Sequence, residues 1–178
     1  PVCLHLDNAE EVPLVRTCIE AGFGSVMIDA SRYDFEENVR ITRMAADMAH
    51  ANGVCIEGEL GAVGRADETA VEGAGGASLT DPARAAEFVE RTGVDALAVA
   101  IGNAHGIYRQ MPSLDFDRLE AIRESCAVPL VLHGGSGTPA DQLARAVGMG
   151  MCKVNVASEV SRAYMEAVHE CYGASEGK

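Results

Sequence analysis

Two histidines, each followed by glycine, are the first candidates for chemistry in this sequence. His105 and His133 both stand at or just beyond the end of an apolar run of strand length. Imidazole nitrogens are common zinc ligands, so two histidines at equivalent places on neighbouring strands could converge on one ion. Each histidine alone could equally be a hydrogen-bonded polar residue at a strand end. The pair is what favours a metal site.

A third strand end, His5-Leu6-Asp7-Asn8, brings a carboxylate. Asp7 is the best candidate proton carrier, because a carboxylate beside a bound cation and a polarised substrate can act as general acid or base once desolvation moves its pKa. Its structural alternative is to cap the helix that follows. His5 shares a strand face with Asp7, which favours a supporting role over metal ligation. Asp29 and Glu59, at two further strand ends, could hold a second cation or orient metal ligands.

Two turns near the end of the chain resemble a phosphate-binding cradle. Gly134-Gly135-Ser136-Gly137 follows one apolar run and Asn155-Val156-Ala157-Ser158 follows the next. Backbone N–H groups exposed by glycine, a serine hydroxyl and a helix N-terminus can together bind a dianion. Glycine in a tight turn is weak evidence by itself. The position of these turns strengthens it, since barrels bind phosphate after their last two strands.

Apolar runs alternate with helical patterns along the chain, which is typical of βα units around a parallel sheet. We expect strands at residues 2–6, 25–28, 54–59, 96–101, 130–133 and 151–156. We expect helices at residues 12–21, 35–52, 82–92, 116–126, 140–149 and 159–171. Gly22, Gly53 and Gly93 each follow an expected helix, and Asp81 precedes a proline at the start of the helix that ends before Gly93. These are signals for helix ends and a helix start.

Consecutive βα units of this length fit either an open doubly wound sheet or part of an eight-stranded TIM (β/α)8 barrel. Polar residues recur at nearly every strand end, namely Asp7, Asp29, Glu59, His105, His133 and Asn155. An open sheet concentrates its site at one switch point, so a ring of polar ends favours the barrel. A chain that covers roughly barrel strands 3 to 8 would also account for its start at Pro1, inside an apolar run. We therefore expect residues 1–178 to form a single partial barrel domain.

Composition narrows the range of partners. With 27 acidic and 14 basic side chains the formal charge is −13, which disfavours nucleic acid and membrane surfaces as partners. Apolar stretches fall short of the roughly 20 residues of a membrane helix, and the scattered cysteines are typical of free thiols in a reducing compartment. We expect a soluble cytoplasmic protein. Residues 61–78, glycine-rich and without periodicity, are predicted to be a mobile active-site loop, with a surface insertion as the alternative.

Several segments together resemble the class II, zinc-dependent ketose-bisphosphate aldolases, in the fructose- and tagatose-bisphosphate branch. The segments include LHLD, GFGSVMIDAS, IEGELG, VPLVLHGGSGTP and CKVNVAS, in collinear order over nearly the whole chain. The resemblance implies a TIM barrel without its first two strands and its C-terminal region. It also implies a lyase of carbohydrate metabolism, in glycolysis, that reversibly cleaves a ketose bisphosphate to dihydroxyacetone phosphate and an aldehyde. Zinc would polarise the ketone and stabilise an enediolate.

The resemblance assigns roles to individual residues. It implies that His105 and His133 are zinc ligands, that Asp7 is the catalytic acid/base, and that Asp29 and Glu59 serve an auxiliary cation position. The residues implied on the phosphate and enediolate side are Gly106, Gly134, Ser136, Asn155 and Ser158. A monovalent cation, Na⁺ or K⁺, is often nearby in the family, whose members generally form homo-oligomers.

Asn8 departs from the family pattern, which has histidine there as the third zinc ligand. An amide oxygen is a weaker zinc donor than imidazole, so Asn8, water or Glu59 could take the third position for zinc or another divalent metal. The leading hypothesis is an aldolase-type lyase. Its alternatives are a non-catalytic sugar-phosphate-binding homologue with a degraded metal site, and an incomplete chain without stable function. Retention of Asp7 and both histidines favours the enzyme.

Overall fold

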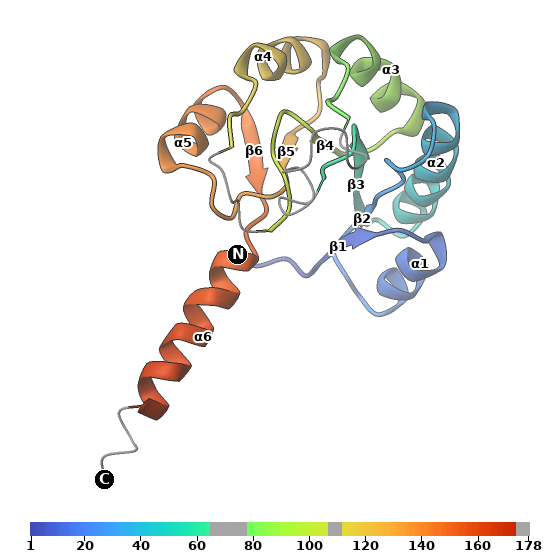
Figure 1. Ribbon diagram of the computed structural model, residues 1–178. Helices are drawn as coiled ribbons and strands as arrows, with labels where there is room; N and C mark the ends of the chain where they lie inside the picture. Colours follow the sequence, from blue (N-terminus) through green and yellow to red (C-terminus); the bar gives the residue numbers. More distant parts are fainter. Residues whose placement is uncertain (65–77, 107–111, 174–178) are drawn as a thin grey trace.

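The computed structural model of the protein describes residues 1–64, 78–106 and 112–173. Its centre is one six-stranded parallel sheet in which strands that follow each other in the chain are neighbours (Figure 1). The strands are β1 (His5–Ala9), β2 (Ser25–Ile28), β3 (Cys55–Leu60), β4 (Ala96–Val99), β5 (Leu130–Leu132) and β6 (Met151–Val154). This arrangement confirms the predicted parallel βα order.

Helices follow the strands in strict alternation, and all but the last cover the outer face of the curved sheet (Figure 1). They are α1 (Val12–Glu20), α2 (Phe35–Ala51), α3 (Pro82–Thr92), α4 (Phe116–Ser125), α5 (Ala140–Gly148) and α6 (Ser158–Gly173). The last helix, α6, extends away from the rest of the molecule, and none of its residues is buried. The core is therefore built by the sheet with α1 to α5.

Local sequence signals set several helix boundaries. Gly22, Gly53 and Gly93 follow helices with φ of 90°, 68° and 72°, the left-handed conformation predicted for a glycine after a helix. The Asp81 carboxylate accepts a hydrogen bond from the backbone N–H of Ala83 at 2.9 Å, so it caps α3 as predicted.

The first strand lies further along the chain than predicted. The apolar pattern placed it at residues 2–6, whereas β1 spans His5–Ala9 and Val2 is fully exposed. The reason is its neighbour: β2 begins at Ser25, the partner of His5, so earlier residues have little sheet to pair with. The strands β4, β5 and β6 also end one or two residues before the predicted positions. His133 and Asn155 therefore lie in the turns that follow β5 and β6.

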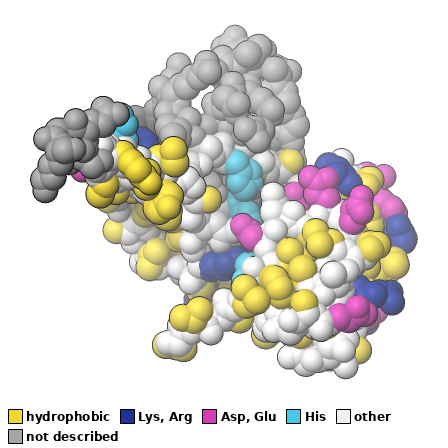
Figure 2. All heavy atoms as spheres, turned by 90° about the horizontal axis from the view of Figure 1, so that it is seen from below, with side chains coloured by type: hydrophobic (Ala, Val, Ile, Leu, Met, Phe, Trp, Pro, Cys, Tyr) yellow, Lys and Arg dark blue, Asp and Glu magenta, His cyan; other side chains and the backbone are white. Residues whose placement is uncertain are grey.

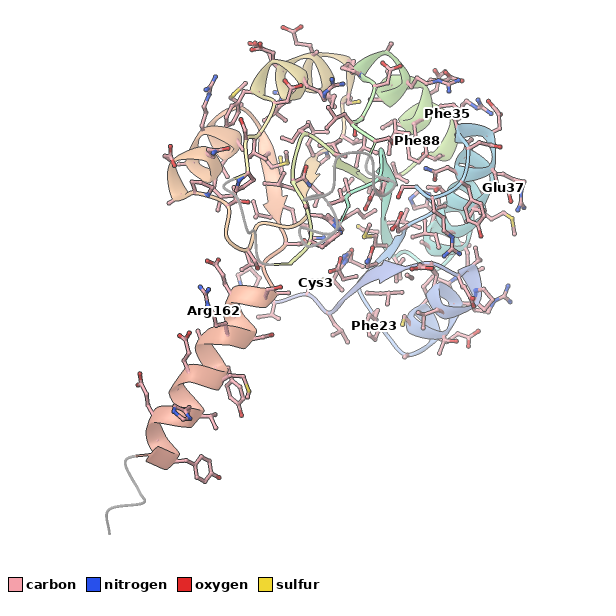
Figure 3. The ribbon with its side chains drawn as sticks, in the orientation of Figure 1. Cys3, Phe23, Phe35, Glu37, Phe88 and Arg162 are labelled. Atoms are coloured by element: carbon pink, nitrogen blue, oxygen red, sulfur yellow. The ribbon has the colours of Figure 1, made fainter. Side chains whose placement is uncertain are left out.

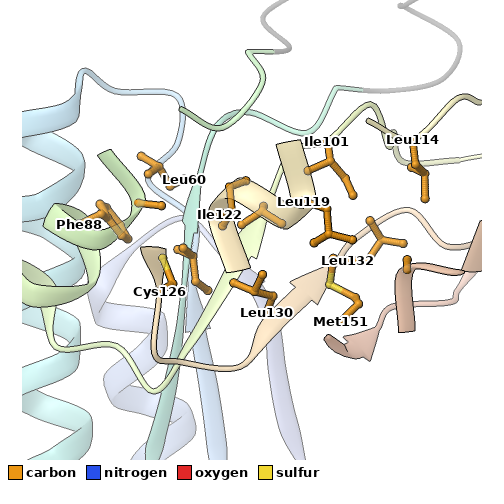
Figure 4. Packing of buried hydrophobic residues seen from close by; sticks show 14 of the residues in the cluster. Leu60, Phe88, Ile101, Leu114, Leu119, Ile122, Cys126, Leu130, Leu132 and Met151 are labelled. Carbon is orange, nitrogen blue, oxygen red and sulfur yellow. The ribbon is translucent and has the colours of Figure 1, made fainter. Parts of the chain in front are cut away.

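The two faces of the sheet bury different kinds of side chain. The outer face packs against the helices through a large apolar cluster that includes Phe88 and Leu132 (Figure 4), and through a second cluster near β1 and β2. On the inner face Met27, Ala98 and Val131 form a small apolar cluster. The acidic and histidine side chains that are buried among the described residues, Glu57, Glu59 and His133, lie on this inner face by strand alternation.

Three further predictions concern the cysteines, membrane-spanning helices and the loop at residues 61–78. The six cysteines are free, as predicted, although only Cys18 and Cys126 are buried. No helix within the described ranges is long and apolar enough to cross a membrane. Most of the loop predicted at 61–78 falls on residues 65–77, which lie outside the described residues, and an antiparallel bridge joins Ala62 to Ser78 at its ends.

Candidate active site

Strand alternation brings pairs of polar side chains to the inner face, because residues two apart on a strand share a face. The pairs are His5 and Asp7 at β1, Glu57 and Glu59 on β3, and Lys153 and Asn155 at the end of β6. Across the sheet, Lys153 Nζ donates to Glu57 Oε2 at 2.7 Å. Asn155 Nδ2 donates to Asp7 Oδ1 at 2.9 Å. Figure 2 shows histidine and acidic side chains together near the centre of this face.

His133 lies among these groups with 1% of its surface exposed. Its Nε2 is 2.9 Å from Glu57 Oε1. Burial opposes the ionisation of Glu57, but hydrogen bonds from His133 and Lys153 outweigh it and lower the pKa of this carboxyl. Burial likewise opposes the charge of His133, but its hydrogen bond with Glu57 and the charge of Glu59 raise its pKa. Glu57 is therefore a buried carboxylate held between two donors.

Two buried polar atoms beside this contact have no hydrogen-bond partner among the described residues, His133 Nδ1 and Glu59 Oε2. They are 3.9 Å apart. The other oxygen of Glu59 accepts from Ser31 Oγ and from the Val63 N–H, each at 3.3 Å. Burial, and next the charge of Asp29, raise the pKa of Glu59 to about 8. A cation between the two unpartnered atoms would satisfy both.

His105 lies beside His133, as the sequence predicts. The ring centroids are 5.7 Å apart and the rings are nearly perpendicular, at 84°. Within the described ranges, no three side chains of His, Cys, Asp or Glu already stand together as a metal cluster. The chemistry of the donors nevertheless fits a divalent metal, because zinc takes imidazole nitrogen and carboxylate oxygen as ligands. His133 Nδ1 and Glu59 Oε2, both buried and without a hydrogen-bond partner among the described residues, would hold such an ion.

Asp7 and Asn8 lie at a bulge in β1. Leu6 pairs with Val26 and Ala9 with Ile28, so β1 carries one residue more than β2 over this stretch. Bulges of this kind re-aim side chains near active sites. Asn8 has a φ of 57°, and no other described residue except glycines has a positive φ. Asparagine is one of the few side chains that tolerate this conformation.

Asp7 itself is exposed, and Asn155 is its hydrogen-bond partner. The capping alternative for Asp7 is wrong, because the residue at the N-cap of α1 is Glu11, which makes no side-chain cap hydrogen bond. Asp29, at the end of β2, accepts from the Ser31 N–H at 2.9 Å and lies close enough to Glu59 to affect its pKa.

The turns after β5 and β6 lie against each other, as the cradle prediction requires. The Gly135 N–H donates to the Asn155 carbonyl at 2.9 Å. Ser136 Oγ accepts from the N–H groups of Ala157 and Glu159 at 3.1 and 3.3 Å. Ser136 thus caps the start of α6, which begins at Ser158, and its O–H remains as a possible donor.

The glycines predicted at the two histidine turns have conformations that favour glycine. Gly134 has a φ of 66°, and a Cβ there would lie 2.0 Å from the Ala104 carbonyl oxygen. The close approach of the two histidine turns therefore requires glycine at this position. Gly106 has a φ of 99°, and a Cβ there would meet no atom of the described residues within 4 Å.

The chain matches the family model described as "Fructose-bisphosphate aldolase class-II" over residues 1–178. A curated fructose-bisphosphate aldolase of Geobacillus stearothermophilus is 46% identical over 170 residues, which cover 96% of this chain and 58% of that protein. The chain belongs to the class II fructose-bisphosphate aldolase family. The resemblance seen in the sequence motifs is confirmed.

Solved structures of aldolases have the same fold. The YdjI aldolase from Escherichia coli K12 matches with a TM-score of 0.83 and 40% identity, covering 96% of this chain and 58% of that one. A putative fructose-1,6-biphosphate aldolase from Coccidioides immitis matches with a TM-score of 0.85 and 33% identity, covering 96% and 61%. The chain thus spans about 58% of the curated relative's length. These matches confirm the partial TIM barrel.

Three residues of this candidate site received no role from the sequence. Glu57 and Lys153 each stand two residues before a predicted site residue, and that spacing could have revealed them. Asn103 accepts from the Ile101 N–H at 2.8 Å and donates to the His133 carbonyl at 2.9 Å, so it joins the two histidine turns. Only its place two residues before His105 pointed to it.

Proposed function

We propose that the protein is a metal-dependent aldehyde-lyase that reversibly cleaves a phosphorylated ketose into dihydroxyacetone phosphate and an aldehyde. Membership of the class II aldolase family supports this activity. The observation that carries it is the open pair of buried donor atoms, His133 Nδ1 and Glu59 Oε2, 3.9 Å apart. A module that only bound sugar phosphate would gain nothing from leaving these two atoms unsatisfied.

The metal, zinc or another divalent ion, would be held by His105, His133 Nδ1 and Glu59, with Asn8 as a further candidate ligand. When bound it supplies a Lewis acid that polarises the ketone and stabilises the negative charge left by carbon–carbon cleavage. Asp29, which influences Glu59, would serve an auxiliary cation position. A monovalent cation, Na⁺ or K⁺, is a further expected cofactor on the phosphate side.

Asp7 is the proposed acid/base. Cleavage requires a base to take the proton from the hydroxyl next to the bond that breaks, and that oxygen becomes the aldehyde carbonyl. The electron pair of the broken bond passes to the dihydroxyacetone phosphate half. The Asn155 amide, 2.9 Å from Asp7 Oδ1, orients the carboxylate for this transfer. In the reverse direction the same carboxyl returns the proton.

The substrate phosphate is proposed to bind at the paired turns after β5 and β6 and the histidine turn beside them. The residues are Gly106, Gly134, Ser136, Asn155 and Ser158. Ser136 and the neighbouring Gly135 already tie the two turns together. Glycine N–H groups and the Ser136 O–H are the donors that a dianion requires. Homo-oligomerisation and a cytoplasmic location stay predictions.

Metal analysis paired with an aldol-cleavage assay on fructose and tagatose bisphosphates tests the proposal. Asp7→Asn should lower kcat by about 10²- to 10⁴-fold while binding of dihydroxyacetone phosphate persists. Asp47→Asn, which removes an exposed carboxylate paired with Arg43 on α2, is the matched control and should leave kcat unchanged. A protein without divalent metal that still binds dihydroxyacetone phosphate would instead be a non-catalytic homologue.

A further inference from the structure

A buried carboxylate connects the proposed metal ligand His133 to a lysine on a distant strand. Glu57 is 3% exposed, with Oε1 2.9 Å from His133 Nε2 and Oε2 2.7 Å from Lys153 Nζ. The three side chains come from β3, from the turn after β5 and from β6. The proposed reaction gives neither Glu57 nor Lys153 a role, although burying this charge is costly.

Charge determines which nitrogen of His133 carries the proton. An ionised carboxylate only accepts hydrogen bonds, and the Lys153 ammonium at 2.7 Å keeps Glu57 ionised. Nε2 must therefore bear the proton that points to Glu57, and in the neutral ring Nδ1 has the lone pair. Asn155 Nδ2, 3.3 Å from Nε2, donates instead to Asp7 at 2.9 Å. The nitrogen with the lone pair is the one 3.9 Å from Glu59 Oε2.

We propose that Glu57 and Lys153 are positioning residues that hold His133 in the tautomer able to bind metal through Nδ1. The inference rests on the proposed metal site and identifies the residues that prepare it. Carboxylates that accept from the second nitrogen of a metal-bound histidine fix its ring and raise its basicity. Lys153 acts through residue 57. Because an ammonium only donates, an acceptor atom of residue 57 must face Nζ, and this fixes which atom is left to face the imidazole.

Lys153 is itself held from the opposite edge of the sheet. Its Nζ donates to His5 Nε2 at 3.2 Å, and His5 Nδ1 is 2.8 Å from Ser25 Oγ. An ammonium cannot accept, so His5 is neutral with its proton on Nδ1. Burial, and next the charge of Lys153, lower the pKa of His5 in agreement with this assignment. His5 thus has the supporting role that its position two residues before Asp7 predicts.

Glu57→Gln distinguishes the positioning role from a packing role. The glutamine side chain has nearly the shape of glutamate, but it ends in one acceptor and one donor. Lys153 can only donate, so the amide oxygen turns to Nζ and the NH₂ group turns to His133. His133 Nε2 must then accept, and its proton moves to Nδ1, the nitrogen proposed for the metal. We expect metal affinity to fall about 10- to 100-fold.

Adding Lys153→Met to Glu57→Gln should reverse the effect. Without the ammonium, the amide can turn its oxygen to His133 Nε2–H and its NH₂ group toward His5 Nε2, which lies 3.9 Å from Glu57 Oε2. The double variant should therefore recover most of the lost affinity. A purely structural role predicts the opposite, since the second substitution removes one more contact.

Two readouts on the purified protein test the inference: Co²⁺ affinity by absorbance titration, and the ¹⁵N NMR signals of His133 in metal-free protein above the pKa of the ring. Glu57→Gln should weaken Co²⁺ binding and move the proton to Nδ1, and the double variant should restore both. Glu37→Gln, which removes a carboxylate on the outer side of α2 (Figure 3), is the matched control and should change neither.

Two results would overturn the inference: an Nε2 proton that stays in place in Glu57→Gln, or a double variant that binds Co²⁺ no better than the single one. The NMR readout needs no metal. A wild-type protein that binds no Co²⁺ would therefore refute the proposed metal site, while the ¹⁵N signals would still decide the tautomer.

Discussion

The outer and inner faces of the sheet bury side chains equally well but of opposite kinds. Phe88 on α3 and Leu119 on α4, which pack against the outer face, are 0% exposed. On the inner face Glu57, Glu59 and His133 are 3%, 1% and 1% exposed. Burial of apolar surface stabilises a protein by about 25 cal/mol per Å². Burial of ionisable groups costs free energy unless partners replace the lost water. The outer face therefore supplies stability, and the inner face holds chemistry at some expense to it.

Buried polar atoms that lack a hydrogen-bond partner also distinguish the inner face from the outer face. Among the described residues, the buried side-chain atoms without a hydrogen-bond partner are His133 Nδ1 and Glu59 Oε2, and both belong to the inner face. Each such atom costs about 1–3 kcal/mol. Violations of this kind are expected at functional sites, where a ligand provides the missing contact.

The largest expected effect comes from the outer face. Phe88 is fully buried on α3 and its ring centroid is 6.1 Å from that of Phe35, with the two rings side by side in Figure 3. Phe88→Ala should lower the free energy of unfolding by about 3–5 kcal/mol, because it leaves a cavity in the main cluster. Urea denaturation measures the change.

The matched control for Phe88→Ala is Tyr164→Ala on α6, where the side chain is 69% exposed. It should change the free energy of unfolding by no more than about 0.5 kcal/mol. Equal effects of the two substitutions would contradict the assignment of stability to the layer between sheet and helices.

The inner face should respond in metal affinity more than in stability. His133→Ala should weaken Zn²⁺ binding at least about 100-fold, or about 2.7 kcal/mol, because it removes the one histidine that is buried among the described residues. The loss of folding stability should be smaller than for Phe88→Ala, since Glu57 keeps its contact with Lys153. Competition with a chromophoric chelator measures the affinity.

His169→Ala, on exposed α6, is the control for His133→Ala and should leave Zn²⁺ affinity unchanged. Wild-type Zn²⁺ affinity in His133→Ala would show that the open nitrogen on the inner face serves no metal, and the contrast between the faces would lose its functional meaning.

The features that could be predicted from the sequence depend on near neighbours in the chain. The Asp81 cap and Gly93 at the end of α3 follow from helix-end rules, and the βα order follows from alternating apolar periods. The meeting of His105 and His133 followed because parallel strands place their carboxyl ends at one edge.

The features that escaped prediction depend on distant parts of the chain. The start of β1 is set by Ser25, where its partner strand begins, so the apolar run before His5 was misleading. The contact of Lys153 with Glu57 spans 96 positions and exists because the sheet curves β6 toward β3. Sequence spacing shows that both side chains face inward, but it does not show which partner each one takes.

A substitution at the β1 bulge should raise the metal affinity of the inner face without changing the stability that the outer face supplies. Asn8→His provides an imidazole at the position where the sequence resemblance implies a third zinc ligand, and histidine is among the residues found at a φ near 57°. We expect Zn²⁺ affinity to rise about tenfold, or about 1.4 kcal/mol, with little change in stability. Isothermal titration calorimetry measures the affinity.

Asn52→His, on the exposed C-cap of α2, adds the same group away from the site and is the control for Asn8→His. If Asn8→His binds Zn²⁺ no more tightly than this control, the side chain at position 8 does not reach the metal position, and Asn8 is excluded as a further ligand beside Glu59.

The smallest expected effect on the free energy of unfolding comes from removing a helix-capping charge in the outer layer. Asp115 caps α4, and the Arg118 N–H, together with its guanidinium, holds the pKa of this carboxyl below its usual value of 3.8. A lowered pKa adds stability that is present above the unfolded-state value and is lost as pH falls through the folded-state value. Asp115→Asn keeps the cap acceptor but removes the charge, so it should cost less than about 1 kcal/mol at neutral pH. In urea titrations the difference from wild type should shrink as the pH falls below 3.8 and the Asp115 carboxyl takes up its proton. It should also shrink in high salt, because charge is what separates the two side chains. A difference that stays constant with pH would assign the effect to packing instead.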